Sequence, residues 1–433
     1  MPRGKYDVII YGASSFVGAI LTRYIASQYG LNRDLKWAIA GRSERKLQQV
    51  RGTLVKALGE DAGQVDILLA DAADPDALAA LCANTRVIVS TVGPYALYGE
   101  PLVKACVEAG IDYCDLTGEP QWIKRMLDTY EGRAKETGAR IVHCCGFDSI
   151  PSDMGVQHLQ SLAKERFGHT LPRIEMRVKV AKGGMSGGTI ASMMQLTKEA
   201  LANPSVKKDL ANPYSLCPPD HGFRARQNEP RGAFRDRASG AWAMPFIMAA
   251  INTRIVHRTN ALLDKAYGER FQYSEAMLTG KGSKGRRMAK AMTFGLGAFI
   301  VGAALKPSRW LLENYLLPKP GQGPSEKEQE TGFFDIRFYG YQDDKQASRP
   351  VIETKVTGDK DPGYGFTAKM LGEAAVCLAK DYHNSGKKRW AKGGIWTPGS
   401  IFNEVFLDRL TSNANMTFDE VVKAADADEN KAA

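Results

Sequence analysis

The first 150 residues alternate short apolar runs with longer segments of helical character. The apolar runs predict strands at residues 7–11, 36–40, 65–69, 87–91, 112–115 and 140–144. The segments between them predict helices near residues 16–29, 44–58, 74–82, 101–109 and 120–135. Continuous apolar runs of this length are typical of a parallel sheet that helices cover on both faces. We therefore predict an α/β domain over residues 1–150, with a doubly wound parallel sheet of the Rossmann type.

The pattern changes after Pro151. Residues 173–180 alternate strictly, and residues 334–338 and 352–356 repeat the alternation. One face of the first segment is apolar and consists of Ile174, Met176, Val178 and Val180. Such alternation is typical of antiparallel strands with one covered face. We predict a second, α+β domain over residues 151–362 with a mixed or antiparallel sheet, which helices near residues 189–202 and 244–267 could cover.

The remaining segments complete the predicted organisation. Residues 203–240 are rich in Pro, Gly and Arg and predict a long loop that could act as a lid. Helical character returns over residues 363–379 and 393–410, which places C-terminal helices at 363–411. From Ser412 the chain is acidic and rich in Ala, so we predict a partly disordered tail over 412–433, with disorder in its last dozen residues.

Composition narrows the class of protein. The 433 residues, 44% hydrophobic and 24% charged, fit two folded soluble domains. A net charge of +10 suits nucleic acid, an anionic membrane or a phosphate-bearing ligand. Nucleic acid is the weakest of these, since the chain has no basic arm and no zinc-finger spacing. The seven cysteines lie in apolar runs, so we expect reduced thiols and a cytoplasmic protein without a secretory signal.

The turn after the first predicted strand carries a glycine motif. Gly12 permits a tight turn, and Gly18 lets the following helix approach the sheet closely. Ser15 stands where this motif usually has its middle glycine, and its Cβ narrows the approach to the phosphates. Amides at a helix start stabilise a pyrophosphate. We predict a dinucleotide site here, with an ordinary turn as the alternative, formed by Gly12, Ala13, Ser14, Ser15, Phe16, Val17 and Gly18.

Basic residues follow the second predicted strand. An NAD site usually has a carboxylate at this position. Arg42, Ser43 and Lys46 suit the 2′-phosphate of NADP, and a solvated basic helix start is the alternative. Asp71, after the third strand, can reach the adenine amino group or cap a helix. We therefore predict NADP(H) as the cofactor.

The fourth predicted strand opens into Thr91, Val92, Gly93, Pro94 and Tyr95. In a doubly wound sheet this loop lies at the carboxyl edge, beside the nicotinamide. Reduction also needs a proton donor and a polarised carbonyl. The phenols of Tyr95 and Tyr98 are candidates, and packing or gating is the alternative for both.

Three carboxylates end later strands at the same edge, namely Asp115, Glu119 and Asp148. Each could bind substrate or act as an acid. The pairs 148–149 and 152–153 also have the composition of helix caps, which is the alternative for Asp148. We expect His143, Cys144 and Cys145 to pack. The candidate catalytic residues are thus Tyr95, Tyr98 and Asp148, and the spacing indicates no metal site, no Ser-His-Asp triad and no P-loop.

A basic and an apolar segment adjoin in the second domain. Residues 281–290 hold five basic groups and no acid, and residues 291–305 are uncharged. The uncharged run is too short to span a bilayer. It suits either burial as a helix in the domain or peripheral docking, through residues 281–309, on the inner face of the plasma membrane.

Motifs along residues 6–410 resemble the saccharopine dehydrogenase-like oxidoreductases, which include the trans-acting enoyl reductases of mycobacterial lipid synthesis. They lie at residues 12–18, 40–42, 91–95, 113–119, 145–153, 185–189, 363–368 and 394–399. The resemblance implies an NADP-binding domain, a mixed α/β domain and C-terminal helices that pack back on the first domain. Enoyl reductases of this family reduce a C=C bond in a lipid precursor made by a separate polyketide synthase, whereas saccharopine dehydrogenases act on an amino-acid conjugate. The resemblance supplies no established catalytic residue.

Three functions follow as hypotheses. The first is an NADP-dependent reductase of a lipid-like C=C or C=O substrate in the cleft between the domains, as in glycolipid biosynthesis. Apolar content at residues 246–251 and 294–305 favours it. The second is a saccharopine-type dehydrogenase, whose substrate carboxylates need an arginine cluster such as Arg224, Arg226, Arg231, Arg235 and Arg237. The third is a non-catalytic NADP-binding scaffold at a membrane or lipid surface. A homodimer formed through the second sheet is a further expectation.

Overall fold

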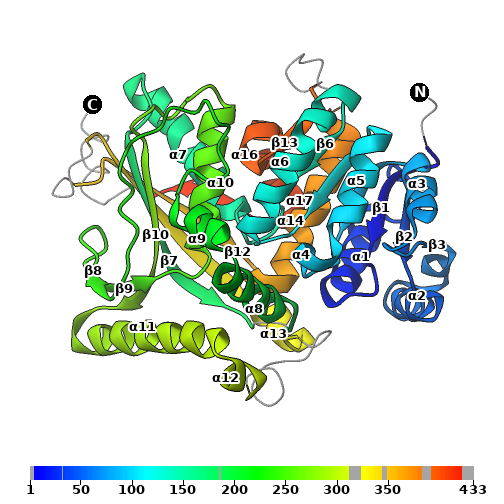
Figure 1. The fold of residues 1–433 in the computed structure, drawn as a ribbon, viewed down its shortest axis with the longest axis horizontal. Helices are drawn as coiled ribbons and strands as arrows, with labels where there is room; N and C mark the ends of the chain where they lie inside the picture. Colours follow the sequence, from blue (N-terminus) through cyan, green and yellow to red (C-terminus); the bar gives the residue numbers. More distant parts are fainter. Residues whose placement is uncertain are drawn as a thin grey trace, which may run out of the picture.

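The chain forms two seven-stranded sheets, with helices between and around them (Figure 1). In this computed structural model, residues 4–31, 33–184, 187–311, 323–343, 349–382 and 392–421 are described. The N-terminal half of the first sheet and the second sheet lie at opposite ends of the long axis in Figure 1. Helices α7 (Ile150–Phe167) and α10 (Ala249–Leu262) lie between the two sheets.

The first sheet is the doubly wound parallel sheet that the sequence predicts. Its order is β13-β6-β5-β4-β1-β2-β3, and all its neighbours run parallel. Six strands fall on the predicted apolar runs: β1 (Tyr6–Tyr11), β2 (Trp37–Gly41), β3 (Asp66–Leu69), β4 (Thr85–Ser90), β5 (Asp112–Asp115) and β6 (Arg140–Val142). The strand order reverses between β1 and β4, where such sheets form a ligand crevice.

Helices cover both faces of this sheet, and the bounds of all but the short α4, which was not predicted, follow the predicted segments. They are α1 (Phe16–Tyr29), α2 (Glu44–Leu58), α3 (Pro75–Ala83), α4 (Tyr95–Tyr98), α5 (Glu100–Ala109) and α6 (Pro120–Thr137). The longer helices bury apolar residues on one side, such as Leu47, Val50 and Leu54 on α2. A short 3-10 turn, η1 (Glu60–Gln64), follows α2.

The seventh strand, β13 (Gly394–Trp396), corrects the prediction of a helix over 393–410. It pairs in parallel with β6 and buries Ile395. Helices α16 (Pro398–Ile401) and α17 (Asn403–Ala414) follow it. Three residues are too few for periodicity to separate a strand from a helix start.

The C-terminal segment returns to the first domain, as expected from the resemblance. Elements η3 (Pro362–Phe366), α14 (Thr367–Val376) and η4 (Cys377–Asp381) contact α1, β1 and β4. Every residue of α14 is buried. The Tyr24 hydroxyl on α1 donates to Glu373 Oε1 at 2.6 Å, and Gly372 packs against the Tyr24 ring.

The second sheet is mixed, with the order β14-β12-β11-β7-β10-β9-β8. Its strands are β7 (Arg173–Lys182), β8 (Phe234–Arg235), β9 (Trp242–Pro245), β10 (Gln272–Gly280), β11 (Phe333–Tyr341), β12 (Ile352–Gly358) and β14 (Thr417–Glu420). Strands β7 and β10 run parallel, and the other pairs that the structure describes are antiparallel. Strand β10 was not predicted.

Helices α7 and α10 cover the inner face of this sheet, where Ile174, Met176 and Val178 are buried. Val180 lies beyond this cover and is exposed, against the prediction of one continuous apolar face. The expected cover by residues 189–202 was wrong, because α8 (Gly187–Ala202) contacts α4, α9 (Pro204–Ala211) and α11 (Gly282–Ala304) instead. The predicted helix at 244–267 is shorter than expected, because its start belongs to β9.

Two other predictions need correction. Residues 203–240 are not one long loop, since they contain α9 and β8. The predicted tail from Ser412 begins inside α17 and then forms β14, which pairs with β12. Its last dozen residues lie outside the described residues. Helices α12 (Lys306–Leu311) and α13 (Glu326–Thr331) complete the fold.

Candidate active site

The glycine turn between β1 and α1 has the geometry that a dinucleotide site needs. Gly12 has φ +82°, and a Cβ on it would lie 2.4 Å from the Val92 side chain. A Cβ on Gly18 would lie 2.2 Å from the Gly12 carbonyl oxygen. Both positions therefore exclude a side chain, so the turn stays tight and the helix stays close to the sheet.

Ser15 caps α1 and ties the turn to the end of β4. Its Oγ accepts from the Gly18 N–H at 2.9 Å and donates to Thr91 Oγ1 at 2.9 Å. Thr91 Oγ1 in turn donates to the Gly12 carbonyl at 2.9 Å. The serine thus points inward and leaves the phosphate side of the turn to the backbone. Described residues offer no acceptor to the Phe16 and Val17 N–H groups, which begin the helix and suit an anion.

The end of β2 carries an unpaired cation. Arg42 is exposed, and no described residue forms an ion pair with it. Ser43 begins α2 without a side-chain cap bond, so its hydroxyl is free of the helix. Lys46, also exposed, lies one turn further along α2. These groups fit the 2′-phosphate of NADP.

Asp71 does not cap a helix. Its Oδ1 accepts from the Ala73 N–H at 3.0 Å within the loop, and Asp74 caps α3 instead. Burial raises the pKa of Tyr11 to about 12, where Asp71 acts in the same direction and Arg42 against it. Asp71 and Arg42 thus lie close enough to the Tyr11 phenol to affect its titration.

The loop after β4 places Tyr95 away from a substrate. Its hydroxyl donates to the Ser90 carbonyl at 2.9 Å, its ring packs on Trp122, and the residue is 3% exposed. The geometry favours the packing alternative for Tyr95. Tyr98, at the end of α4, is 51% exposed, and Gly93 is exposed beside the crevice.

Glu119 holds the start of α4 in place. Its two carboxylate oxygens accept from the N–H groups of Tyr95 and Ala96, each at 2.9 Å. Ser192 on α8 donates to the same carboxylate at 2.7 Å. Burial raises the pKa of Glu119, and these three donors oppose the rise. The sequence did not indicate Ser192, because its partner lies 73 residues away in another domain.

Asp115 is buried, and both of its carboxylate oxygens have polar partners. It accepts from the N–H groups of Thr117 and Cys144 and lies 2.7 Å from His143 Nδ1. His143 and Cys144 are buried, as predicted, and all seven cysteines are free thiols. Among described residues, no group of three side chains could hold a metal ion.

Asp148 differs from these carboxylates. It forms no hydrogen bond to another described side chain, and the cap interpretation was wrong because α7 begins without a side-chain cap bond. It lies against Gly118, whose Cβ would be 2.8 Å from Asp148 Oδ2. Asp148 is half-buried, and the loss of water around its carboxyl, together with the nearby charge of Glu275, raises its pKa to about 7.

Glu275 on β10 forms a buried polar cluster behind Asp148. It accepts from Asn252 Nδ2 at 2.9 Å and from the Tyr273 hydroxyl at 2.8 Å. Burial raises its pKa to about 7 as well. The Ser149 hydroxyl donates to Asn252 Oδ1, which links this cluster to the loop that carries Asp148. Glu275 was not among the predicted site residues, since β10 was not predicted.

C-terminal residues complete the surroundings of the glycine turn. The Phe16 and Tyr364 rings meet edge to face at 5.3 Å. Asp361 accepts from the N–H groups of Tyr364 and Gly184, which joins η3 to the end of β7. Thr367 accepts from the Phe147 N–H at 3.0 Å and so fixes the residue before Asp148.

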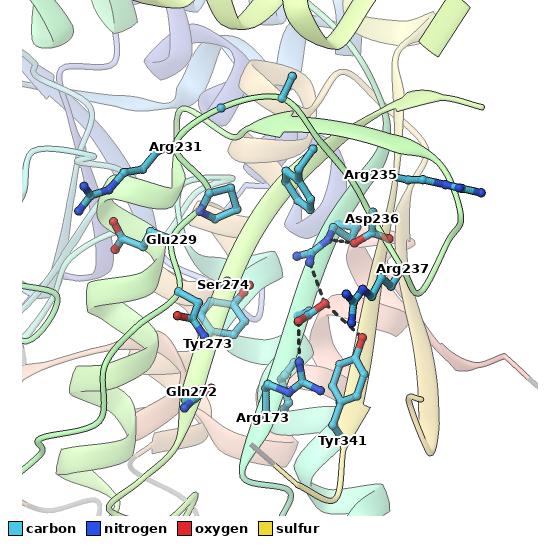
Figure 2. A pocket seen from close by; sticks show the side chains of 18 residues that line it. Arg173, Glu229, Arg231, Arg235, Asp236, Arg237, Gln272, Tyr273, Ser274 and Tyr341 are labelled. Atoms are coloured by element: carbon cyan, nitrogen blue, oxygen red, sulfur yellow. Dashed lines mark hydrogen bonds and ion pairs between the residues drawn. The ribbon is translucent and has the colours of Figure 1, made fainter. Parts of the chain in front are cut away.

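The arginines that a saccharopine-type substrate would need do not lie beside Asp148. A cavity of about 480 Å³ is lined by Arg173, Arg177, Arg231, Arg235 and Arg237 among others. Figure 2 shows this cavity from close by. Neighbouring residues of a strand point to opposite faces, so Arg173 and Arg177 project from the face of β7 opposite to the buried Ile174. The sequence predicted that only one face of this sheet is covered. In the structure, residues 228–237 cover this outer face as well. This part of the segment predicted to act as a lid therefore lies on the outer face of the second sheet.

Ion pairs hold this outer cluster together. Arg177 contacts Asp236 at 2.6 Å and Glu175 at 2.8 Å, and Arg173 contacts Glu175 at 3.0 Å. The Arg173 guanidinium also lies 3.7 Å from the centre of the Tyr341 ring. Asp148 and Glu275 lie toward the other face of the sheet, so the cluster does not supply cations beside Asp148.

The turn, the unpaired Arg42 and the carboxyl edge define a protein of the nicotinamide-dependent oxidoreductase class. Residues 8–142 match the family model of the saccharopine dehydrogenase NADP binding domain. A Mycobacterium tuberculosis protein named a "putative trans-acting enoyl reductase" is 40% identical over 415 residues, which cover 94% of this chain and 95% of that protein. A Mycobacterium bovis trans-acting enoyl reductase is 35% identical over 419 residues, with 94% and 96% covered.

The chain belongs to the saccharopine dehydrogenase-like oxidoreductases, in the branch whose relatives are named trans-acting enoyl reductases, and its cofactor is NADP. Among solved structures, yeast saccharopine dehydrogenase (L-Glu forming) has a TM-score of 0.47 at 14% identity, with 96% of this chain and 99% of that chain covered.

Proposed function

We propose that this oxidoreductase reduces the C=C bond of an α,β-unsaturated acyl thioester in a lipid or polyketide-derived precursor, as in glycolipid biosynthesis. The observation that carries the proposal is Asp148, a half-buried carboxyl with a pKa of about 7 at the carboxyl edge of the first sheet. A group with this pKa is protonated often enough at neutral pH to act as a general acid. The names of relatives that match nearly the whole chain support the reaction type.

In the proposed reaction, NADPH held at the glycine turn and Arg42 would supply the hydride that reduces the β-carbon of the acyl chain. The electron pair of the C=C bond moves to the α-carbon and the thioester oxygen as enolate charge. Protonated Asp148 then donates its proton to the α-carbon and becomes a carboxylate, which regains a proton from solvent. Glu275 acts as a positioning residue, since its charge adds to the effect of burial in raising the Asp148 pKa.

The saccharopine-type alternative has less support from the site. Its substrate carboxylates need cations near the nicotinamide, whereas the arginines expected to supply them include Arg231, Arg235 and Arg237, which line the outer cavity of the second sheet. Arg177 in that cavity already pairs with two carboxylates.

An assay with short-chain and long-chain enoyl pantetheine thioesters tests the proposal. We expect NADPH consumption that increases with chain length, a saturated product by mass spectrometry, and a loss of about 10²- to 10⁴-fold in kcat for Asp148→Asn. Tyr95→Phe is the matched control, since its hydroxyl bonds only within the first domain in this structure. NADPH consumption with a 2-oxo acid and an amino acid, but with no enoyl thioester, would overturn the proposal.

A further inference from the structure

Helix α11 lies along one edge of the molecule, below β9 and α8 in Figure 1. It includes most of the apolar run at 291–305, for which burial within the second domain was one expectation. The structure contradicts that expectation, because Phe294 is 78%, Val301 59% and Leu305 57% exposed. In the whole helix only Gly285, Ala289 and Ala303 are buried.

The helix is nevertheless firmly attached along its inner side. A Cβ on Gly285 would lie 2.1 Å from the Gly280 carbonyl oxygen, so the helix start touches β10. The Arg286 guanidinium lies 5.5 Å from the centre of the Trp242 ring on β9. Ala303 packs against Met194 of α8 near the other end. The outer side of α11 is therefore a fixed surface.

That outer side has two chemically different halves. Helical spacing of three or four residues aligns the side chains that we call the α11 docking face: Lys284, Arg287, Lys290, Phe294, Val301 and Leu305. The first three are basic and the last three are large and apolar. Residues 281–311 contain no acidic side chain. Trp310 of α12, which is 58% exposed, extends the apolar end.

We propose that the α11 docking face binds the surface of an anionic lipid bilayer. The basic half then lies among anionic headgroups, and the apolar half enters the outer part of the acyl region. No helix in the described part of the chain is long and apolar enough to cross a membrane. A lipid surface fits better than an acidic protein, because large exposed apolar side chains continue the basic row along the same side of the helix, and an anionic bilayer offers both headgroup charge and an acyl region.

The docking face is one helix away from the candidate active site. Helix α8 contacts α11 on one side and α4 on the other, and its Ser192 bonds to Glu119. Docking therefore holds α8 and the loop after β4 near the leaflet, where a long acyl chain resides. This last step rests on the proposed function, whereas the docking itself does not.

Flotation of the full-length protein with vesicles tests the docking. We expect binding to vesicles of phosphatidylcholine and phosphatidylglycerol in equal parts at low salt, and little binding to phosphatidylcholine alone. Each basic residue near an anionic surface contributes about fivefold, so the double variant Arg287→Glu with Lys290→Glu should bind at least about 25-fold more weakly. Lys56→Glu with Lys104→Glu, exposed basic residues of the first domain, is the charge-matched control and should bind like wild type.

The apolar half is tested separately. Phe294→Asp should lower binding to the anionic vesicles, whereas Leu58→Asp, an exposed apolar residue on α2, should not. Undiminished NADPH binding shows that each variant is folded. If Phe294→Asp does not fold, Phe294→Ser is used in its place. Equal binding of the wild type to neutral vesicles, or unchanged binding of both α11 variants, overturns the proposal. So does a wild-type dimer in vesicle-free solution that Phe294→Asp converts to a monomer, because a second copy then covers the face. None of these readouts involves turnover, so a failure of the docking proposal can be distinguished from a failure of the proposed reaction.

Discussion

Ser192 on α8 donates a 2.7 Å hydrogen bond to Glu119, the carboxylate that also accepts the N–H groups of Tyr95 and Ala96. Glu119 is 1% exposed. One buried side chain thus fixes the loop after β4, which we predict to lie beside the nicotinamide, and joins it to α8. Movement of α8 would be transmitted to this loop through Glu119.

Replacing Glu119 with Ala leaves two N–H groups without their acceptor. We expect the free energy of unfolding to fall by about 2–4 kcal/mol, because each buried unsatisfied donor costs about 1–3 kcal/mol. Ser192→Ala removes one bond and should cost only about 1 kcal/mol. Urea denaturation measures both. Equal losses for the two variants would show that the backbone bonds to Glu119 contribute little.

We expect Arg42 to determine the preference of the protein for NADPH over NADH. Its guanidinium has no ion-pair partner among the residues that the structure describes, so a 2′-phosphate can take that place. Arg42→Gln should weaken NADPH binding about 10- to 100-fold, as a charge-assisted hydrogen bond is worth about 1.5–3 kcal/mol, and should leave NADH binding unchanged. Calorimetric titration of both nucleotides measures this, with Arg33→Gln as an exposed control in the same domain. An equal loss for NADH would place Arg42 outside the 2′-phosphate site.

The pH dependence of reduction should follow Asp148. Its pKa of about 7 means that the acid form is lost as the pH rises above about 7, so kcat/KM should fall about tenfold per pH unit there. Glu275→Gln removes a negative charge near Asp148 and should move the midpoint of this fall to lower pH. A midpoint that stays in place in Glu275→Gln would show that burial, rather than the charge of Glu275, raises the Asp148 pKa, whereas a fall that persists in Asp148→Asn would separate the pH dependence from Asp148.

Asp153 should make stability depend on pH. Burial raises its pKa to about 7, although Thr259 and the Gly399 N–H both donate to Oδ2 at 2.8 Å. The folded state therefore binds more protons than the unfolded state between about pH 4 and about pH 7, and the free energy of unfolding falls as the pH rises through this window. Asp153 contributes on the order of 4 kcal/mol to this fall at most.

Asp153→Asn keeps an acceptor oxygen and removes the titration. We expect its free energy of unfolding to depend less on pH than that of the wild type, by denaturant titration at several pH values. Asp34→Asn, an exposed carboxylate, is the control and should retain the wild-type slope. An unchanged slope in Asp153→Asn would show that this carboxyl is ionised in the folded protein.

The sequence predicted the first sheet well because its evidence is local. Several of its strands contain a run of consecutive apolar residues, such as 8–11 in β1, and Gly12 and Gly18 follow that strand closely in sequence. Helix α10 shows the opposite case. All ten residues from Ile251 to Asn260 are buried, and most of them are polar, so no apolar stripe indicates its bounds.

The polar side chains of α10 are stabilised by contacts distant in sequence. Arg258 donates to the carbonyls of Leu216 and Ile395 and pairs with Glu131 at 3.0 Å. Contacts distant in sequence also explain why Glu275 was not predicted as part of the candidate site. Glu275 acts on Asp148 across more than a hundred residues of chain, and the sequence could place a carboxylate at the sheet edge without showing which one would remain unbonded.

Transfer of a labelled hydride tests the central claim most directly. The protein is incubated with an enoyl pantetheine thioester and NADPH that carries deuterium at the transferable position, and the acyl product is analysed by mass spectrometry. The account predicts a saturated product with one deuterium on the β-carbon and an unlabelled hydrogen on the α-carbon, formed much more slowly by Asp148→Asn. Recovery of unreduced thioester, from protein that binds NADPH normally, would contradict it.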